Sequence, residues 1–190
     1  MILSKLLHGD RVHLNALTSD DLPIIARWYE DTDFMRLYDA LPARPRSEAE
    51  LTQWLEGLQK DKNNTFAFAI RTRDSDALVG TVELDGILWA HGTSGLGIAI
   101  GDRAHWGQGY GYQAAQLALA FAFNELNLHR ITATVFSYNA RSIALMEKLG
   151  FQREGAFREF LQRDGERYDM LLYGLLRREW EAQEISDDIS

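Results

Sequence analysis

Three glycines alternate with larger residues in the stretch 106–112, "WGQGYGY", directly before the helix-like apolar run "QAAQLALAFAFNEL". Glycine costs a helix roughly 1 kcal/mol relative to alanine, so Gly107, Gly109 and Gly111 at a helix start need a compensating reason. The first turn of a helix offers N–H groups without partners and a partial positive charge, which together bind anions. Glycines let a phosphate approach the backbone and let the loop adopt positive φ. The stretch therefore predicts a cradle for a phosphate or pyrophosphate.

Two well-known phosphate-binding loops do not fit this spacing. A Walker loop requires Lys followed by Ser or Thr after its last glycine, whereas this chain has Tyr112 and Gln113. The dinucleotide fingerprint spaces its glycines G-x-G-x-x-G directly after a strand and needs an acid at the end of the next strand. Here the spacing is G-x-G-x-G, and the next strand-like run ends in Phe136 and Ser137. A glycine-rich turn that binds nothing stays open as the alternative.

Hydrophobic periodicity and turn residues give the elements that must position this loop. The predicted order is β-α-α-β-β-β-α-β-α-β-β, a mixed α+β or α/β fold whose sheet has about seven mostly antiparallel strands and about four flanking helices. The run 95–100, the helix after the glycines and the run 131–136 form a strand, crossover helix and strand, which should be parallel and right-handed. The expected strands cover 11–17, 65–70, 77–84, 95–100, 131–136, 156–162 and 167–176.

Helix ends are marked by capping residues. Ser47 and Glu50 form a capping box at the start of one helix, and Thr18 or Ser19 should cap an earlier one. The stretch 139–151, "NARSIALMEKLGF", carries signals at both of its ends. Asn139 is the expected N-cap, Gly150 sits where a left-handed C-cap belongs, and Phe151 can make the closing hydrophobic contact.

Composition limits the class of protein. The 190 residues suggest one domain over 1–182 with a frayed acidic tail over 183–190. The chain has no cysteine, which excludes disulfides and an acyl-cysteine mechanism, and its five histidines lack zinc-ligand spacing, so no metal is expected. The net charge of −8 argues against nucleic-acid binding and suits either solubility or cationic partners. Without a signal peptide or an apolar run long enough to cross a bilayer, a cytoplasmic protein with no membrane partner is expected.

The glycine loop, its helix and the stretch 139–151 together resemble the GNAT superfamily of acyl-CoA-dependent N-acetyltransferases. The element order matches this family from about Arg11 to Trp180. The family loop, Q/R-x-x-G-x-G/A, falls on residues 106–111, with Trp106 in place of the usual Gln or Arg. The loop is similar to that of the branch that acetylates ribosomal-protein N-termini. The later stretch "RDGERYDMLLYGLL" is similar to that branch and to spermidine acetyltransferases.

The resemblance implies acetyl-CoA or coenzyme A as the cofactor. Backbone amides of 107–112 would hold its pyrophosphate, and the strand 98–100 would pair with the pantetheine arm as an added strand does. Asn139 and Ser142 would line its far side, although they could equally be a helix cap and an ordinary first-turn residue, and Lys148 could be a solvated lysine. The residues implied to contact the cofactor are Ile98, Ala99, Ile100, Trp106, Gly107, Gln108, Gly109, Tyr110, Gly111, Tyr112, Asn139, Ser142 and Lys148.

Without cysteine, the acceptor amine is expected to attack the thioester directly in a ternary complex. The ammonium must lose a proton, and a backbone N–H of the strand 95–100 should stabilise the oxyanion. The leaving-group acid usual in the family is a tyrosine, and aligning "EKLGF" places Met146 there. Either Ser142, Tyr138 or water replaces it, or the protein binds without turnover. Because a thiol of pKa near 8.5 leaves tolerably as a thiolate, loss of the acid should slow the reaction more than abolish it.

Glu83 is the first candidate for the general base, because it falls near the end of a strand beside the expected cofactor cleft. An outward-facing strand carboxylate is the alternative. Glu159 is a second candidate, and Ser142 is kept as a possible catalytic group. His105 adjoins the glycine loop but is expected on the surface.

The resemblance implies that the segment 28–42, which mixes acids with aromatic residues, shapes the acceptor pocket. Such a mixture suits a cationic amine, while helix-end charges with buried rings are the alternative. Trp89 could close this pocket or simply pack. The residues expected to contact the amine are Trp28, Tyr29, Asp33, Tyr38 and Trp89.

The leading hypothesis is an acetyl-CoA-dependent N-acetyltransferase that acts on a protein N-terminus or a small amine. A polyamine or aminoglycoside acetyltransferase is the enzymatic alternative. The alternative from another class is a module that binds coenzyme A without turnover. It is suggested by Met146, which stands where the family has its proton donor. The terminal hairpin offers an edge that could pair in a homodimer.

Overall fold

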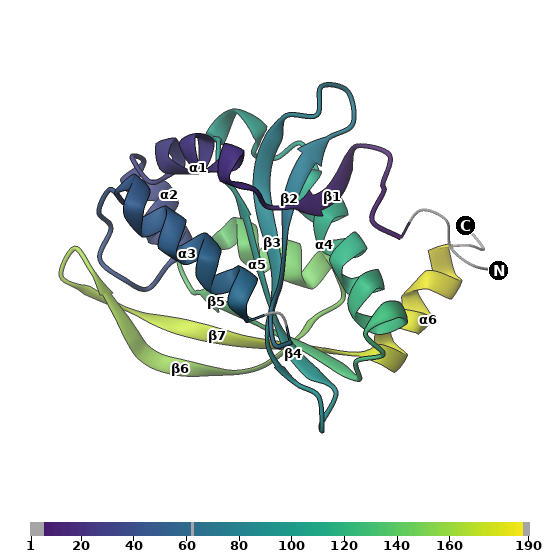
Figure 1. Ribbon diagram of the computed structural model, residues 1–190. Helices are drawn as coiled ribbons and strands as arrows, with labels where there is room; N and C mark the ends of the chain where they lie inside the picture. Colours follow the sequence, from purple (N-terminus) through teal and green to yellow (C-terminus); the bar gives the residue numbers. More distant parts are fainter. Residues whose placement is uncertain (1–5, 62, 188–190) are drawn as a thin grey trace.

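The computed structural model describes residues 6–61 and 63–187, and its centre is a seven-stranded sheet of order β1-β2-β3-β4-β5-β7-β6 (Figure 1). Neighbouring strands are antiparallel except for β4 and β5, which are parallel, so the predicted mixed and mostly antiparallel sheet is confirmed. The strands are β1 (Val12–Ala16), β2 (Phe66–Thr72), β3 (Leu78–Leu88), β4 (Thr93–Ile100), β5 (Arg130–Phe136), β6 (Gln152–Arg163) and β7 (Glu166–Leu176).

Six α-helices accompany the sheet in the described part of the chain, where about four were predicted. The unexpected α2 starts because the Asp31 carboxylate accepts the N–H groups of Asp33 and Phe34, at 2.9 and 3.2 Å. The unexpected α6 continues to Asp187 through part of the segment predicted to fray, of which 188–190 lie outside the described residues. The helices are α1 (Leu22–Trp28), α2 (Thr32–Tyr38), α3 (Glu48–Lys60), α4 (Tyr110–Ala120), α5 (Ala140–Lys148) and α6 (Arg177–Asp187).

No helix in the described part of the chain is both long enough and apolar enough to cross a membrane. The helices instead cover the two faces of the sheet, with α1, α2 and α3 gathered on one side (Figure 1). Their apolar side chains form one core with Ala69 and Ala99. A second core joins α4, α5 and the buried Trp180 of α6 to the opposite face, where Trp180 stacks on Phe123 at 5.1 Å between ring centroids.

The predicted helix caps are present. The Ser47 capping box with Glu50 starts α3, and a Thr18 box with Asp21 starts the turn that leads into α1. In α5 the Asn139 side chain accepts the N–H of Ser142 at 3.2 Å. Local polar residues thus fix where the helices begin, before any tertiary contact is considered.

Candidate active site

The strands β4 and β5 are paired over only three positions. Their register joins Thr93 to Arg130 and ends where Gly95 meets Thr132, after which β4 continues without this neighbour. Gly101 donates its N–H to Val79 of β3 at 2.9 Å. Because backbone groups alternate in direction along a strand, the amides and carbonyls of Ile98 and Ile100 point away from β3, to the open side. A strand edge of this kind can pair with an extended ligand.

Trp106 occupies part of this open edge. Its indole Nε1–H donates to the Ile100 carbonyl at 2.7 Å, which leaves both groups of Ile98 and the amide of Ile100 for other partners. The Arg141 guanidinium lies 4.2 Å from the centroid of the Trp106 ring. Since Arg141 belongs to α5 and Trp106 follows β4, this cation–π contact spans the gap between the two diverging strands.

The glycine loop has the conformation that its sequence predicts. Gly107 has φ of 72°, and Gly109, with φ of 83°, is the N-cap of α4. No side chain caps this helix, and its first turn contains no acidic residue. A Cβ on Gly111 would make an ordinary contact, 3.5 Å from Ile100 Cγ1, so this position is not sterically restricted to glycine. The N-terminus of α4 thus presents amides and a positive dipole end that suit an anion.

Positive side chains lie beside this loop although the chain as a whole is acidic. Arg11 donates from Nη1 to the Gln108 carbonyl at 2.7 Å, and a Cβ on Gly109 would lie 3.9 Å from the same nitrogen. Lys148 places Nζ 4.1 Å from the centroid of the Tyr112 ring. Together with Arg141, these cations make the surroundings of the α4 N-terminus favourable for a phosphate.

Glu83 lies on β3 opposite Gly97 of β4. A Cβ on Gly97 would come within 2.9 Å of Glu83 Oε1, so the absence of a side chain makes room for the carboxylate. Burial raises the pKa of Glu83 above its ordinary value, and the Asp85 carboxylate raises it further. A carboxylate of raised basicity next to the open edge of β4 is suited to accept a proton from an ammonium group.

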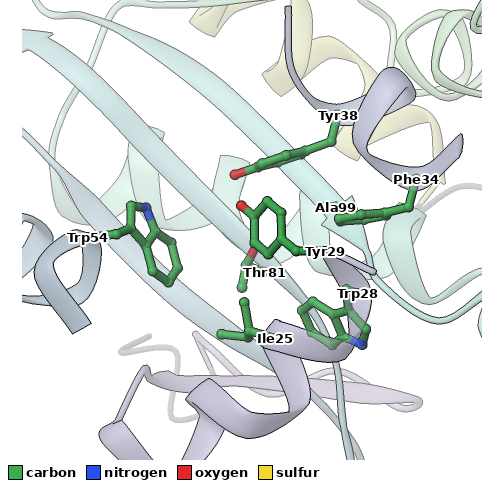
Figure 2. A pocket seen from close by; sticks show the side chains of 8 residues that line it. All are labelled: Ile25, Trp28, Tyr29, Phe34, Tyr38, Trp54, Thr81 and Ala99. Atoms are coloured by element: carbon green, nitrogen blue, oxygen red, sulfur yellow. The ribbon is translucent and has the colours of Figure 1, made fainter. Parts of the chain in front are cut away.

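A small cavity of about 10 Å³ lies on the same side of the sheet, roughly the space of one water (Figure 2). Thr81 of β3 lines it, two residues from Glu83 and therefore on the same face of the strand. Figure 2 shows the hydroxyl groups of Tyr29 and Tyr38 close to each other in this space, with Trp54 facing them. The lining residues are Ile25, Trp28, Tyr29, Phe34, Tyr38, Trp54, Thr81 and Ala99.

The two tyrosines of this cavity are electrostatically linked to Glu83. Burial raises the pKa of Tyr38 well above its usual range, and the charge of Glu83 adds to this effect. The pKa of Tyr29 is raised chiefly by burial, while the Arg46 guanidinium, 4.5 Å from the centroid of its ring, opposes the shift. Both phenols therefore stay protonated at neutral pH and can donate hydrogen bonds.

Of the residues predicted to contact the amine, Trp28, Tyr29 and Tyr38 line the cavity, and two others do not. Asp33 pairs with Arg103 at 2.8 Å, as does Asp31 at 2.5 Å, and the Arg103 hydrogen bond lowers the pKa of Asp31 to about 2. Trp89 lies between β3 and β4, is 48% exposed, and donates its indole N–H to the Asn63 carbonyl at 2.5 Å.

The position at which the family resemblance leads one to expect the acid lies in the core. Met146 is only 2% exposed and belongs to the core under α5. Tyr138 donates its hydroxyl to the Arg36 carbonyl at 2.5 Å, so this phenol is already engaged. Ser142 is half-buried in the first turn of α5, beside the Asn139 cap. Asn139 also donates to the Leu37 carbonyl at 3.3 Å, which ties α5 to α2.

The remaining candidates lie elsewhere. Glu159 is exposed in an irregular part of β6 with φ of 52°, and with Arg158 and Asp169 it lines a shallow groove that does not include Glu83. His105 is half-buried rather than fully exposed, and its Nδ1 is buried without a hydrogen-bond partner among the described residues. The prediction that His105 lies on the surface is therefore only partly correct.

Four further residues lie at the site without having been predicted from the sequence, namely Arg11, Arg141, Thr81 and Trp54. Arg11 meets the glycine loop across 97 residues of chain, and Arg141 meets Trp106 across the strand gap. Neither contact leaves a local signal in the sequence. Thr81 could have been predicted, because it lies two residues before Glu83 and therefore on the same face of β3.

Comparison with known proteins agrees with this geometry. A family model described as an acetyltransferase (GNAT) domain matches residues 11–152. The SPbeta prophage-derived uncharacterized N-acetyltransferase YokL of Bacillus subtilis (strain 168) is 32% identical over 174 residues, which cover 91% of this chain and 94% of that protein. The [ribosomal protein uS5]-alanine N-acetyltransferase of Escherichia coli (strain K12) is 25% identical over 182 residues, 92% of each chain.

A solved structure resembles most of this chain. Spermidine N-acetyltransferase from Vibrio cholerae, in complex with CoA and spermine, superposes with a TM-score of 0.81 at 26% sequence identity. The match covers 90% of this chain and 99% of that one.

Proposed function

Because the chain belongs to the GNAT acetyltransferase family, we propose that this enzyme transfers the acetyl group of acetyl-CoA directly to the primary amine of a cationic acceptor. The position of Glu83 carries this proposal. Its half-buried carboxylate lies opposite Gly97, and the next residue of β4, Ile98, presents its backbone groups to the gap. A base and an open strand edge thus meet at one point.

The donor side of the site suits the chemistry of coenzyme A. The amides at the start of α4, with Arg11, Arg141 and Lys148 nearby, would hold its phosphates. The open edge at Ile98 would pair with its extended arm. When bound, acetyl-CoA would supply an activated acetyl thioester. The predicted roles of Asn139 and Ser142 along the same arm remain part of this proposal.

The residues of the chain then have three tasks. Glu83 accepts a proton from the acceptor ammonium, and the free amine forms the N–C bond as the C–S bond breaks. The amide of Ile98 or Ile100 donates to the developing oxyanion. The thiolate leaves without a protein acid at Met146, which has no proton to give. From ammonium to amide, the nitrogen gains one acetyl group and loses two protons: the first goes to Glu83 before the attack, and the second passes to water or to the departing thiolate as the amide forms.

Two kinds of amine suit the role of acetyl acceptor. The aromatic lining next to Glu83 favours a small cationic amine, and the structural similarity to a spermidine N-acetyltransferase supports it. A protein N-terminus is the second candidate, supported by the relative that acetylates alanine on ribosomal protein uS5.

An amine panel with acetyl-CoA, read by thiol release, tests the proposal. Spermidine and a peptide with N-terminal alanine or serine separate the two acceptors. Glu83→Gln should lower kcat/KM by roughly 10²- to 10⁴-fold, the usual contribution of a general base, with an unchanged Kd for coenzyme A. If no amine raises thiol release above hydrolysis while calorimetry shows coenzyme A binding, the protein is a binding module instead.

A further inference from the structure

Two glycines of β4 face two acids of β3. In the antiparallel register Glu83 lies opposite Gly97 and Asp85 lies opposite Gly95. A Cβ on Gly97 would approach Glu83 Oε1 to 2.9 Å, and one on Gly95 would approach Asp85 Oδ1 to 2.1 Å. Each carboxylate therefore lies over the α-carbon of its glycine, in space that any other residue would fill.

The two acids share one face of the strand. Residues alternate between faces, and the intervening Leu84 is fully buried in the core under α4. Glu83 and Asp85 consequently continue the row that begins with Thr81 at the aromatic cavity. Asp85 is the more exposed of the two, so the row runs from a half-buried base to an acid in contact with solvent.

The position of Asp85 is fixed with respect to the gap. Its partner Gly95 is the last residue of β4 that pairs with β5. The buried Ser94 donates its hydroxyl to the Asp85 carbonyl at 2.9 Å, at the point where β3 begins a bulge. Asp85 thus stands next to the closed end of the gap, and Glu83 stands two residues into its open part.

No cation among the residues that the structure describes neutralises this pair. Among the described residues, neither Glu83 nor Asp85 forms an ion pair with Lys or Arg. Besides Asp85, the described titratable groups that interact electrostatically with Glu83 are Tyr29 and Tyr38, whose phenols are neutral near pH 7. The nearby Arg46 is engaged by Asp39 at 3.2 Å. Adjacent and partly desolvated carboxylates without a counter-charge favour a positively charged ligand.

We propose that Asp85 is a second acidic residue of the acceptor site, seated beside Glu83 by Gly95 and Gly97, and that the pair attracts the positive charge of the acceptor amine. This inference rests on the proposed function. It assigns Asp85 two effects: it binds the ammonium group electrostatically, and its charge makes the neighbouring Glu83 a better proton acceptor.

Kinetics of Asp85→Asn and Gly95→Ala test the proposal in the full-length enzyme. Asp85→Asn should raise the KM for the amine about tenfold, the change expected when one charge of a partly desolvated pair is removed. It should also move the acidic limb of kcat/KM to lower pH, because Glu83 then loses its proton more easily. Gly95→Ala keeps the charge but displaces Asp85, so KM should rise in the same direction.

Gly57→Ala is the matched control, because a Cβ on this residue of α3 meets nothing within 4 Å. It should leave the KM and the pH profile at wild-type values. An unchanged KM for the amine in Asp85→Asn would overturn the proposal, as would a pH profile that does not move.

A carbon-13 NMR titration of the Glu83 carboxyl, assigned with Glu83→Gln, gives a readout without turnover. The midpoint should fall in Asp85→Asn, and an unchanged midpoint would overturn the pairing. If the wild-type enzyme acetylates no amine, the proposed function fails by itself. Calorimetry with spermidine as the probe then decides about Asp85: weaker binding in Asp85→Asn supports the acidic pair, and equal binding overturns it.

Discussion

Met146 shows how a single residue changes what a site can do. The resemblance to the acetyltransferases places a proton donor at this position, and this chain has instead a thioether that is 2% exposed. The side chain packs in the same core as Leu149 and Phe151. The position therefore contributes to packing, and in the proposed reaction the thiolate would leave without a protein acid, by its own stability at neutral pH.

Met146→Tyr should not restore an acid. The larger side chain would have to enter a filled core, so the free energy of unfolding should fall by about 1–3 kcal/mol. Because the position does not open to the gap, kcat should not increase. Denaturant unfolding and steady-state kinetics measure both effects, with Met146→Leu as a volume-conserving control that costs less than about 1.5 kcal/mol. A faster variant with a new basic limb in its pH profile would contradict this account.

Glu83 should make the fold less stable as the pH rises. Its pKa is raised in the folded state by burial, so the folded state binds the proton more tightly than the unfolded chain. The stabilisation by protonation is complete at a pH below the pKa of Glu83 in the unfolded chain. It is lost as the pH rises through the pKa of Glu83 in the folded state. A glutamine side chain cannot ionise, so Glu83→Gln should be more stable than wild type at pH 8, and the difference should shrink near pH 4. Urea unfolding at both pH values checks this, and a difference independent of pH would refute it.

The helix α5 shows what local sequence can determine at the scale of an element. Both of its predicted ends are confirmed: Asn139 caps the start, and Gly150 has φ of 81° after the end. The N–H of Phe151 donates to the Met146 carbonyl, and that of Gly150 to the Glu147 carbonyl, each at 3.0 Å. This pair of bonds is the Schellman arrangement, which requires a left-handed residue at the glycine position.

Gly150→Ala should lower the free energy of unfolding by about 1–2 kcal/mol, because an L-residue is disfavoured at this φ. The new Cβ would also meet the Gln183 side chain at 1.8 Å, so α6 must adjust. Gly57→Ala, in the open interior of α3, should instead stabilise by up to about 1 kcal/mol. Denaturant titrations of both variants separate the effect of φ from that of losing a glycine.

Elements with a weak local signal were not predicted from sequence. The helices α1 and α2 are separated by only three residues, and the local signal that divides them is the single cap residue Asp31. The helix α6 is mostly charged, and Trp180 is the clearest apolar anchor in its described part. The same limit applies to the site: the glycine loop follows from local chemistry, whereas the contacts of Asp33 with Arg103 and of Arg11 with Gln108 join distant segments.

At the scale of the whole molecule, the sheet consists of two parts, β1–β4 and β5–β7, joined by three paired positions. A ligand that pairs with the open edge at Ile98 would supply backbone partners that the protein itself does not provide there. The arginines near the α4 N-terminus would bind the charged end of the same ligand. Coenzyme A should therefore contact both parts of the sheet at once and hold them together.

Coenzyme A should raise the melting temperature and slow amide hydrogen exchange in 98–100 and in the first turn of α4. At one hundred times its Kd the stabilisation by mass action is about 2.7 kcal/mol. Pantetheine, which lacks the phosphates, should protect the strand residues without protecting the start of α4. The affinity for coenzyme A, but not for pantetheine, should fall with added salt, because its phosphates depend on cations. Equal salt dependence for both ligands would argue against the phosphate cradle.

The separation of the two cores has an evolutionary consequence. The segment from α1 to α3, which forms most of the aromatic cavity, packs in one core, against which Trp106 also lies, while α4 packs in the other. Mutations that accumulate in that early segment can alter amine selectivity with little disturbance of the acyl-donor apparatus. Descendants of one ancestral gene could thereby diversify in what they modify and still inherit the same donor.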